Sequence, residues 1–230
     1  MGTRKYIRVP PVTQGQTSYH DEFVPIADEF RQARHGWRKG LAKDGSLRQK
    51  ALELQRALDD HHYTYQFDWL GVPIVRLPDD IVVLQEIIHE EKPDSIVETG
   101  VARGGSVILS ASIQEICGVV PRVLGIDLTF FPHTLTAIQG SRYAQAIKLL
   151  EASSTAADSI TEVSEFLQDS KKALLILDSD HSHSHVLTEL QALGRFLPTG
   201  SLILVADTVV EEMPDDYFPD RHWGVGNSPL

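Results

Sequence analysis

The chain of 230 residues contains a single cysteine, Cys117, and its acidic side chains outnumber its basic ones, giving a formal net charge of −11. A disulfide within the chain is therefore impossible, and we expect a protein of the reducing cytoplasm. Because a surface this anionic repels a phosphate backbone, we expect no nucleic-acid partner. No apolar run approaches the roughly 18 residues that a membrane span needs, so we expect no membrane partner either.

The glycine motifs that bind nucleotide phosphates are also missing. The segment Ser95–Ser106 reads as a short strand, a glycine turn and the start of a helix. Its glycines do not have the G-x-G-x-x-G spacing of dinucleotide folds, and no lysine follows Gly105 as in a Walker loop. An acid, Glu98, precedes the glycines, and this arrangement favours a cationic ligand that carries a ribose. An ordinary strand-to-helix turn is the alternative.

Apolar runs typical of buried strands alternate with helix-compatible segments from residue 95 onward. The strand-like runs begin at Ser95 and continue at 122–128, 146–153, 173–178 and 201–207. The helical segments cover 79–89, 107–116, 155–167 and 186–197. This alternation predicts an α/β fold with a mostly parallel sheet and helices on both faces.

The N-terminal part has a different character, and we divide the chain into 1–77, an N-terminal arm and helical cap, and 78–230, a cofactor-binding domain. Within the first part we expect helices over 22–34 and 47–58, joined by a glycine-bearing basic connector over 36–45. Residues 59–77 are rich in aromatic side chains. They form either a packed cap or one wall of a substrate pocket.

The expected ends of the five strands carry mostly acids. The residues at these ends are Glu98, Asp127, Ser153, Asp178 and Asp207. In parallel sheets the ligand binds at the carboxyl ends of the strands, and an acid at the end of the second strand accepts hydrogen bonds from ribose hydroxyls. NAD and S-adenosylmethionine both satisfy this requirement. The acidic glycine loop would repel a pyrophosphate but tolerates a sulfonium, so we favour S-adenosylmethionine.

Three motifs together resemble a known family. Residues Trp69-Leu70-Gly71-Val72-Pro73, the block Val97-Glu98-Thr99-Gly100 with Gly104-Gly105-Ser106, and Leu177-Asp178-Ser179-Asp180-His181 are similar to the cephalosporin hydroxylase-like methyltransferases of cephamycin biosynthesis, a family that includes rhamnosyl O-methyltransferase-like members. The resemblance covers about Tyr65 to the C-terminus. It implies a Rossmann-like methyltransferase fold, S-adenosylmethionine and often Mg²⁺.

The resemblance also implies roles for individual residues. Glu98, Gly100 and Ser106 would bind the methionine part of the cofactor, Gly104 would belong to the same cofactor site, and Asp127 would bind the ribose. Ser153 or Ser154 would contact the adenine, and Asp178 would lie beside the cofactor. The list of expected cofactor residues is thus Glu98, Gly100, Gly104, Ser106, Asp127, Ser153, Ser154 and Asp178.

A metal site is implied at the ends of the fourth and fifth strands. The resemblance points to Asp178 and Asp207 as Mg²⁺ ligands, with His181 as the general base, and Mg²⁺ prefers such oxygen donors. Related enzymes place an acidic pair where this chain has Ala206-Asp207. We expect either that Asp180, Glu211 or Glu212 substitutes for the missing acid, or that the enzyme works without Mg²⁺. His183 and His185 are expected to be solvated or to cap a helix.

The sequence therefore predicts an S-adenosylmethionine-dependent O-methyltransferase that acts on a small natural product or sugar. A nicotinamide-dependent oxidoreductase and a cofactor-binding subunit without catalysis are the alternatives. Only 23 residues follow Asp207, too few for the antiparallel hairpin that usually closes such sheets. Either the sequence is truncated, or the N-terminal segment or a neighbouring subunit completes the sheet edge, and we expect a homo-oligomer.

Overall fold

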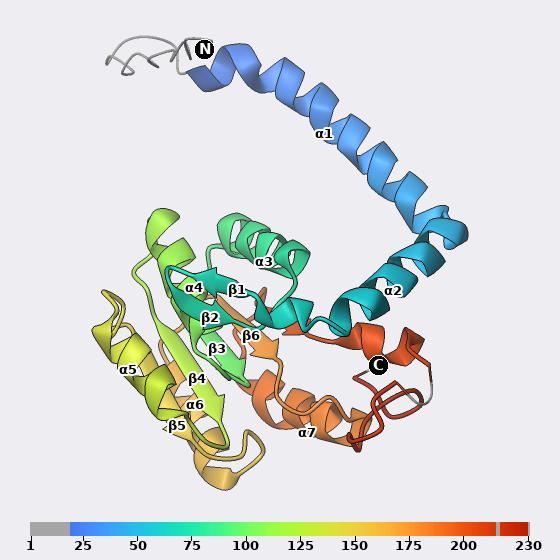
Figure 1. Ribbon diagram of the computed structural model, residues 1–230. Helices are drawn as coiled ribbons and strands as arrows, with labels where there is room; N and C mark the ends of the chain where they lie inside the picture. The colour runs from blue at the N-terminus through green and yellow to red at the C-terminus, as the bar shows by residue number, and fades with distance from the viewer. Residues whose placement is uncertain (1–18, 215–216, 230) are drawn as a thin grey trace, which may run out of the picture. The chain divides into compact units, whose positions relative to one another are not determined.

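The computed structural model describes residues 19–214 and 217–229 (Figure 1), with side chains from Asp28 onward. The predicted arm, residues 1–18, lies outside the described residues. The chain forms two compact units, one up to Leu54 and one over Gln55–Leu230. Residues 55–77, assigned from the sequence to the N-terminal part, thus cluster with the α/β unit.

The N-terminal unit contains the long helix α1, Tyr19–Lys43, and most of α2, Gly45–Asp59. The connector predicted over 36–45 is wrong, because α1 continues through Gly36 and Gly40. Each helical glycine costs only about 1 kcal/mol relative to alanine, and the good helix formers around these two offset that cost. The break comes at Asp44, whose carboxylate accepts a hydrogen bond from the Leu47 N–H at 3.1 Å, the contact typical of a helix N-cap.

The second unit is built on a five-stranded parallel sheet with the order β5-β4-β3-β6-β7. The strands are β3 Ser95–Thr99, β4 Val123–Asp127, β5 Ile147–Glu151, β6 Ala173–Leu177 and β7 Leu202–Val205. All five were predicted from their apolar runs. Every neighbouring pair is parallel, so the predicted fold class is confirmed.

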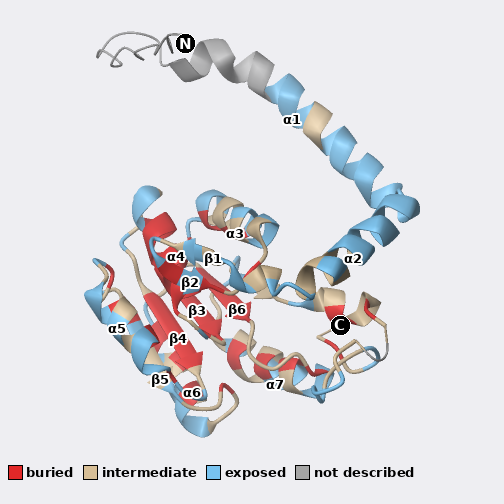
Figure 2. Cartoon of the chain, in the orientation of Figure 1, coloured by how far each residue is buried: buried red, intermediate tan, exposed pale blue. Residues whose placement is uncertain are grey.

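Helices cover both faces of this sheet. They are α3 Pro78–Glu91, α4 Gly105–Ile116, α5 Pro132–Gly140, α6 Ala157–Leu167 and α7 His183–Leu193. Side chains from α3, α4 and α5 pack on one face, and those from α6 and α7 pack on the other. The central strands β3 and β6 are buried along their whole length, and Figure 2 shows the core strands in red. Four of these helices, α3, α4, α6 and α7, were predicted from the sequence, and α5 was not.

A short hairpin precedes the sheet. Its strands β1, Phe67–Trp69, and β2, Val72–Ile74, are antiparallel. Trp69 donates its indole N–H to the Ser112 hydroxyl of α4 at 2.9 Å, and Phe67 also packs against the core. The aromatic segment therefore does serve as a packed cap.

The sheet edge at β7 remains open in the described part of the chain. Among the described residues β7 pairs only with β6, and Leu202 and Ile203 are exposed. Neither the N-terminal residues that the structure describes nor a strand after Asp207 completes this edge. In the described residues, no helix has both the length and the apolar character needed to cross a membrane.

Asp94 joins the entry of β3 to the loop before β6, and we expect its loss to destabilise the fold. Its carboxylate accepts hydrogen bonds from the Ser170 hydroxyl and the Lys171 N–H. Partial burial raises the pKa of Asp94, but these hydrogen bonds outweigh that effect and leave the pKa below its ordinary value. Asp94→Ala should lower the free energy of unfolding at pH 7 by about 1–2 kcal/mol, allowing for the carboxylate's partial exposure.

Because the folded pKa is lowered, this stabilisation is complete above the unfolded pKa of about 3.9 and is lost as the pH falls through the folded value. Urea unfolding of the wild type and Asp94→Ala should therefore differ at pH 7 and converge below about pH 4. Asp169→Ala, at an exposed aspartate, is the control. A difference that stayed constant with pH would contradict the assignment.

Candidate functional site

A cleft of about 1200 Å³ opens at the carboxyl ends of the sheet strands. The loops that follow all five strands line it, together with residues from the segment before α3 and from the C-terminal segment. The chain runs outward from β3 to β5 and then returns to β6, so the switch point of the topology lies between β3 and β6. Ligands of open α/β sheets bind at this point.

The glycine loop after β3 is shaped by close protein contacts. Gly100 has a φ of +82°, and a Cβ there would lie 1.9 Å from the backbone oxygen of Asp178. At Gly105 a Cβ would lie 2.5 Å from the Pro73 oxygen. These glycines allow the loops after β3 and β6, and α4 and the hairpin, to approach one another. Gly100 was assigned from the sequence to the cofactor, and its nearest neighbours in the structure are backbone atoms of Asp178 and Ser179.

Asp127, at the end of β4, holds this loop from the other side. One carboxylate oxygen, Oδ2, accepts the backbone N–H groups of Val101 and Ala102, both at 2.9 Å. Asp127 also lines the cleft, as do Gly100 and Ser106. It thus lies where a ribose-binding acid is expected, and it orients the glycine loop as well.

The centre of the site is an ion triad that the sequence analysis missed. Arg76, between β2 and α3, donates from Nη2 to Glu98 Oε1 at 3.2 Å and to Asp178 Oδ2 at 2.8 Å. Glu98 is completely buried, and Arg76 and Asp178 are 7% and 18% exposed. One signal was present in the sequence, because Arg76 interrupts the otherwise apolar run from Pro73 to Pro78.

The triad and its neighbours carry more negative than positive charge. Burial raises the pKa of the Glu98 carboxyl above its ordinary value, although Arg76 beside it acts in the opposite direction. Burial raises the pKa of Asp178 well above its ordinary value, where Arg76 again opposes and Asp207 adds to the rise. The pKa of Asp80 is raised in the same way. Three carboxyls, those of Glu98, Asp178 and Asp80, thus interact with one buried guanidinium, and the cleft favours a cationic ligand.

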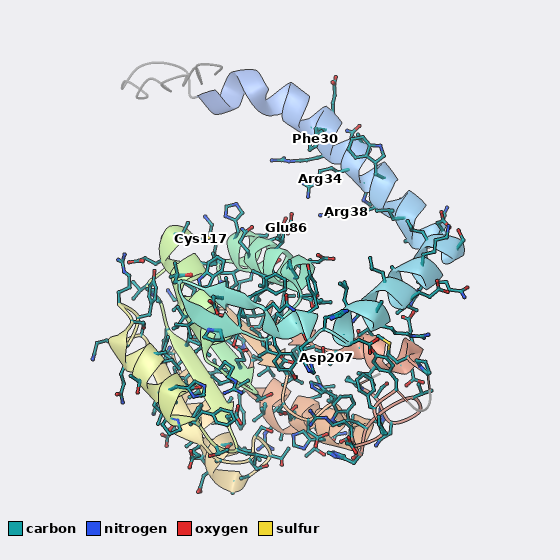
Figure 3. All side chains as sticks on the ribbon, viewed as in Figure 1. Phe30, Arg34, Arg38, Glu86, Cys117 and Asp207 are labelled. Carbon is teal, nitrogen blue, oxygen red and sulfur yellow. The ribbon has the colours of Figure 1, made fainter. Side chains whose placement is uncertain are left out.

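Asp178, His181 and Asp207 come together at the ends of β6 and β7. They offer ligand atoms that all lie within 4.8 Å of one another. His181 Nε2 lies 3.0 Å from Asp207 Oδ2, and the Trp223 ring lies edge-on to the imidazole at 5.0 Å. Asp207, labelled in Figure 3, has a φ of +54°, a conformation that non-glycine residues rarely adopt outside special sites.

The acids expected to substitute at Ala206 have other contacts. Asp180 Oδ2 lies 2.7 Å from His222 Nε2, and Glu211 accepts the Gly226 N–H. Within the described part of the chain, the group that could hold a metal ion consists of Asp178, His181 and Asp207 alone. Asp180, Glu211 and Glu212 do not belong to this group, and substitution by one of them stays a prediction. His181 is the third residue of the group.

The serines expected near an adenine lie in the loop after β5, and both line the cleft. The Ser154 hydroxyl lies 3.1 Å from His185 Nε2, which is also 3.3 Å from the Ser179 hydroxyl. The expectation that His185 is solvated or caps a helix is wrong, because it bridges the loops after β5 and β6. His183 is exposed, as expected.

Of the eight predicted cofactor residues, six line the cleft: Gly100, Ser106, Asp127, Ser153, Ser154 and Asp178. Glu98 lies behind the surface, in the triad. Gly104 is the N-cap of α4, and a Cβ there would touch the side chains of Thr134 and Ile138. Contact between these residues and a cofactor stays a prediction.

A family model described as Rhamnosyl O-methyltransferase/CmcI matches residues 61–230. The rhamnosyl O-methyltransferase of Mycobacterium leprae (strain TN) is 29% identical over 147 residues, which are 64% of this chain and 62% of that protein. The protein of the same name from Mycobacterium tuberculosis (strain ATCC 25618 / H37Rv) is 29% identical over 148 residues, 64% of this chain and 58% of that protein. The chain thus spans less than two thirds of the length of either relative.

Among solved structures, the apo structure of CmcI matches with a TM-score of 0.51 at 21% sequence identity. The match covers 67% of this chain and 64% of that chain. At this identity the likeness establishes the fold, which agrees with the predicted Rossmann-like methyltransferase architecture.

We expect Gly100→Ala to disrupt the site because the added Cβ would overlap the backbone of Asp178. Gly118→Ala is the matched control, since Gly118 has a similar φ of +76° but no atom within 4 Å of an added Cβ. The control should lose about 1–2 kcal/mol of stability from its positive φ alone. Gly100→Ala should lose a further 1–3 kcal/mol or so from overpacking. Equal losses in urea unfolding would show that the loops are not in close contact.

Proposed function

Because this chain belongs to the Rhamnosyl O-methyltransferase/CmcI family, we propose that it transfers a methyl group from S-adenosylmethionine to a hydroxyl oxygen of a small molecule. The observation that carries the proposal is the acidic cleft at the switch point of the sheet, which Asp127 and Asp178 line with Glu98 buried behind its surface. A small-molecule site of typical size measures roughly 300–1,000 Å³. The cleft of about 1200 Å³ has room for a cofactor and an acceptor together.

The charges in the cleft support the choice of cofactor. S-adenosylmethionine carries a positive sulfonium and a ribose, and it supplies an electrophilic methyl group. The excess of carboxyls around Arg76 attracts the sulfonium, and Asp127 stands where a ribose would bind. The same carboxyls would repel the pyrophosphate of a nicotinamide cofactor, so an oxidoreductase is disfavoured.

The residues at the ends of β6 and β7 fit a divalent cation. Asp178 and Asp207 supply the hard oxygen ligands that Mg²⁺ prefers, and His181 lies within the same group. A bound cation would hold the acceptor hydroxyl and make it more acidic. This group of three supports an enzyme over a cofactor-binding subunit without catalysis, although residue 206 is an alanine.

His181 is the proposed general base. Its Nε2 faces Asp207 Oδ2, so the carboxylate can fix the orientation of the ring and leave Nδ1 to accept a proton from the acceptor. Trp223 packs against the imidazole and limits its contact with water. The acceptor oxygen can then attack the sulfonium methyl.

The acceptor is proposed to lie between His181 and the aromatic side chains of the cleft. Tyr65, Phe218 and Trp223 are among the lining residues, so the aromatic segment 59–77 forms one wall of the pocket as well as a cap. The relatives are named rhamnosyl O-methyltransferases, so alkyl rhamnosides are the first acceptors to try. We also propose that the protein forms a homo-oligomer and is located in the cytoplasm.

Asp127 provides the first test of cofactor binding. Asp127→Ala should weaken binding of S-adenosylhomocysteine by about 1.5–3 kcal/mol, the value of a hydrogen bond to a charged group. Because Asp127 also holds the glycine loop, Asp127→Asn is measured beside it, since an amide oxygen can still accept from Val101 and Ala102. Isothermal titration calorimetry gives both affinities, with Asp169→Ala as control and NAD as a competing ligand. Unchanged affinity in both folded variants would remove Asp127 from the site.

His181 provides the test of the chemical step. His181→Ala should bind S-adenosylhomocysteine like the wild type, while methyl transfer to a rhamnoside acceptor falls by about 10²–10⁴-fold. The product is followed by mass spectrometry. His183→Ala, at the exposed histidine that begins α7, serves as control. Near-normal turnover in His181→Ala would leave His181 a structural residue.

A further inference from the structure

Arg76 is the cation that already occupies the carboxylate proposed to bind a metal ion. Its Nη2 lies 2.8 Å from Asp178 Oδ2, the shorter of its two contacts, and the side chain is only 7% exposed. A surface arginine can rotate into water when a metal ion approaches. Arg76 cannot do so readily, because it stands on a short segment fixed by β2 on one side and α3 on the other.

Glu98 forms a second ion pair with the guanidinium of Arg76. It contacts the same nitrogen, Nη2, at 3.2 Å and is completely buried. Arg76 Nε is buried without a hydrogen-bond partner, and the Ser106 hydroxyl lies beside the Glu98 carboxyl. Because one nitrogen of Arg76 contacts both carboxylates, Glu98 competes with Asp178 for the guanidinium.

We propose that Arg76 is a positioning residue that acts as an internal counter-ion of Asp178 and lowers the affinity of the cleft for a divalent cation. The inference rests on the proposed function, which places Asp178 among the metal ligands. A fixed positive charge beside a ligand atom repels a divalent ion, and the repulsion is strong where water is excluded. It also occupies one of the two oxygens of Asp178, so that only the other is fully available.

Arg76 could instead favour metal binding, and that alternative predicts a change in metal affinity of the opposite sign. A guanidinium that merely oriented the Asp178 carboxylate would raise metal affinity, and its removal would weaken binding. The sign of the change in affinity therefore separates the two roles. The change does not depend on turnover or on knowing the acceptor.

The test measures Mn²⁺ binding by electron paramagnetic resonance and by metal-induced shifts in Tm. Arg76→Gln alone would leave two buried carboxylates without a counter-ion, which destabilises folded proteins. The main variant is therefore the double change Arg76→Gln with Glu98→Gln, which removes one positive and one negative charge. It should bind Mn²⁺ at least about tenfold more tightly than the wild type, because the repulsion is lost.

Two further variants keep the test decisive. Glu98→Gln alone commits the guanidinium to Asp178 and should bind Mn²⁺ more weakly than the wild type. Arg76→Lys keeps the charge and should not gain affinity. Arg142→Gln, at an exposed arginine that pairs with Glu115 away from the cleft, is the matched control and should leave Mn²⁺ binding unchanged.

Unchanged, weaker or undetectable Mn²⁺ binding in the double variant would overturn the inference. A double variant that folds only with Mn²⁺ would support it, since the ion then replaces the guanidinium. Calorimetry with S-adenosylhomocysteine on the wild type separates this result from failure of the proposed function. If the wild type binds S-adenosylhomocysteine, the methyltransferase proposal stands whatever Mn²⁺ does. If it does not, that proposal fails.

Discussion

Arg76 places one positive charge between two carboxylates at the centre of the cleft, and the arrangement of the site depends on this contact. Glu98 is the residue before last in the buried strand β3, and Asp178 directly follows the neighbouring strand β6, so the sheet itself brings the two acids together. Without a buried cation their mutual repulsion and their loss of hydration would both oppose folding. A single residue from the segment after the hairpin thus allows the sheet to carry acids at its switch point.

The close approach of two backbone segments, the loops after β3 and β6, is the second constraint on the centre of the cleft. The loop after β3 can lie against the loop after β6 only because Gly100 has no side chain in the direction of Asp178. Asp127 then holds the other side of the β3 loop through two backbone N–H groups. Asp127, an acid at a strand end, therefore has a structural role in the protein itself. It fixes the loop that a cofactor would contact.

The pairing of His181 with Asp207 gives the outer part of the cleft a different character. Asp207 is half exposed and held in a left-handed conformation, while His181 is shielded by Trp223 from the C-terminal segment. The inner part of the cleft is thus a charged, buried region suited to a cation. The outer part carries an imidazole and aromatic rings suited to an acceptor. In the proposed reaction the methyl group passes between these two regions.

The sequence by itself determined the fold class, because five apolar runs separated by helical segments allow little besides a parallel sheet covered on both faces. It also determined that Glu98, Asp127, Asp178 and Asp207 lie at one edge, since the carboxyl ends of parallel strands meet there. Only the tertiary structure decided which acids are paired. Arg76 is 22 residues from Glu98 and 102 from Asp178 in the chain, and no local pattern encodes contacts of that separation. For the same reason the contact of His185 with Ser154 became apparent only in three dimensions. The helical course of residues 36–43 was missed for a local reason, because the surrounding helix formers outweigh Gly36 and Gly40.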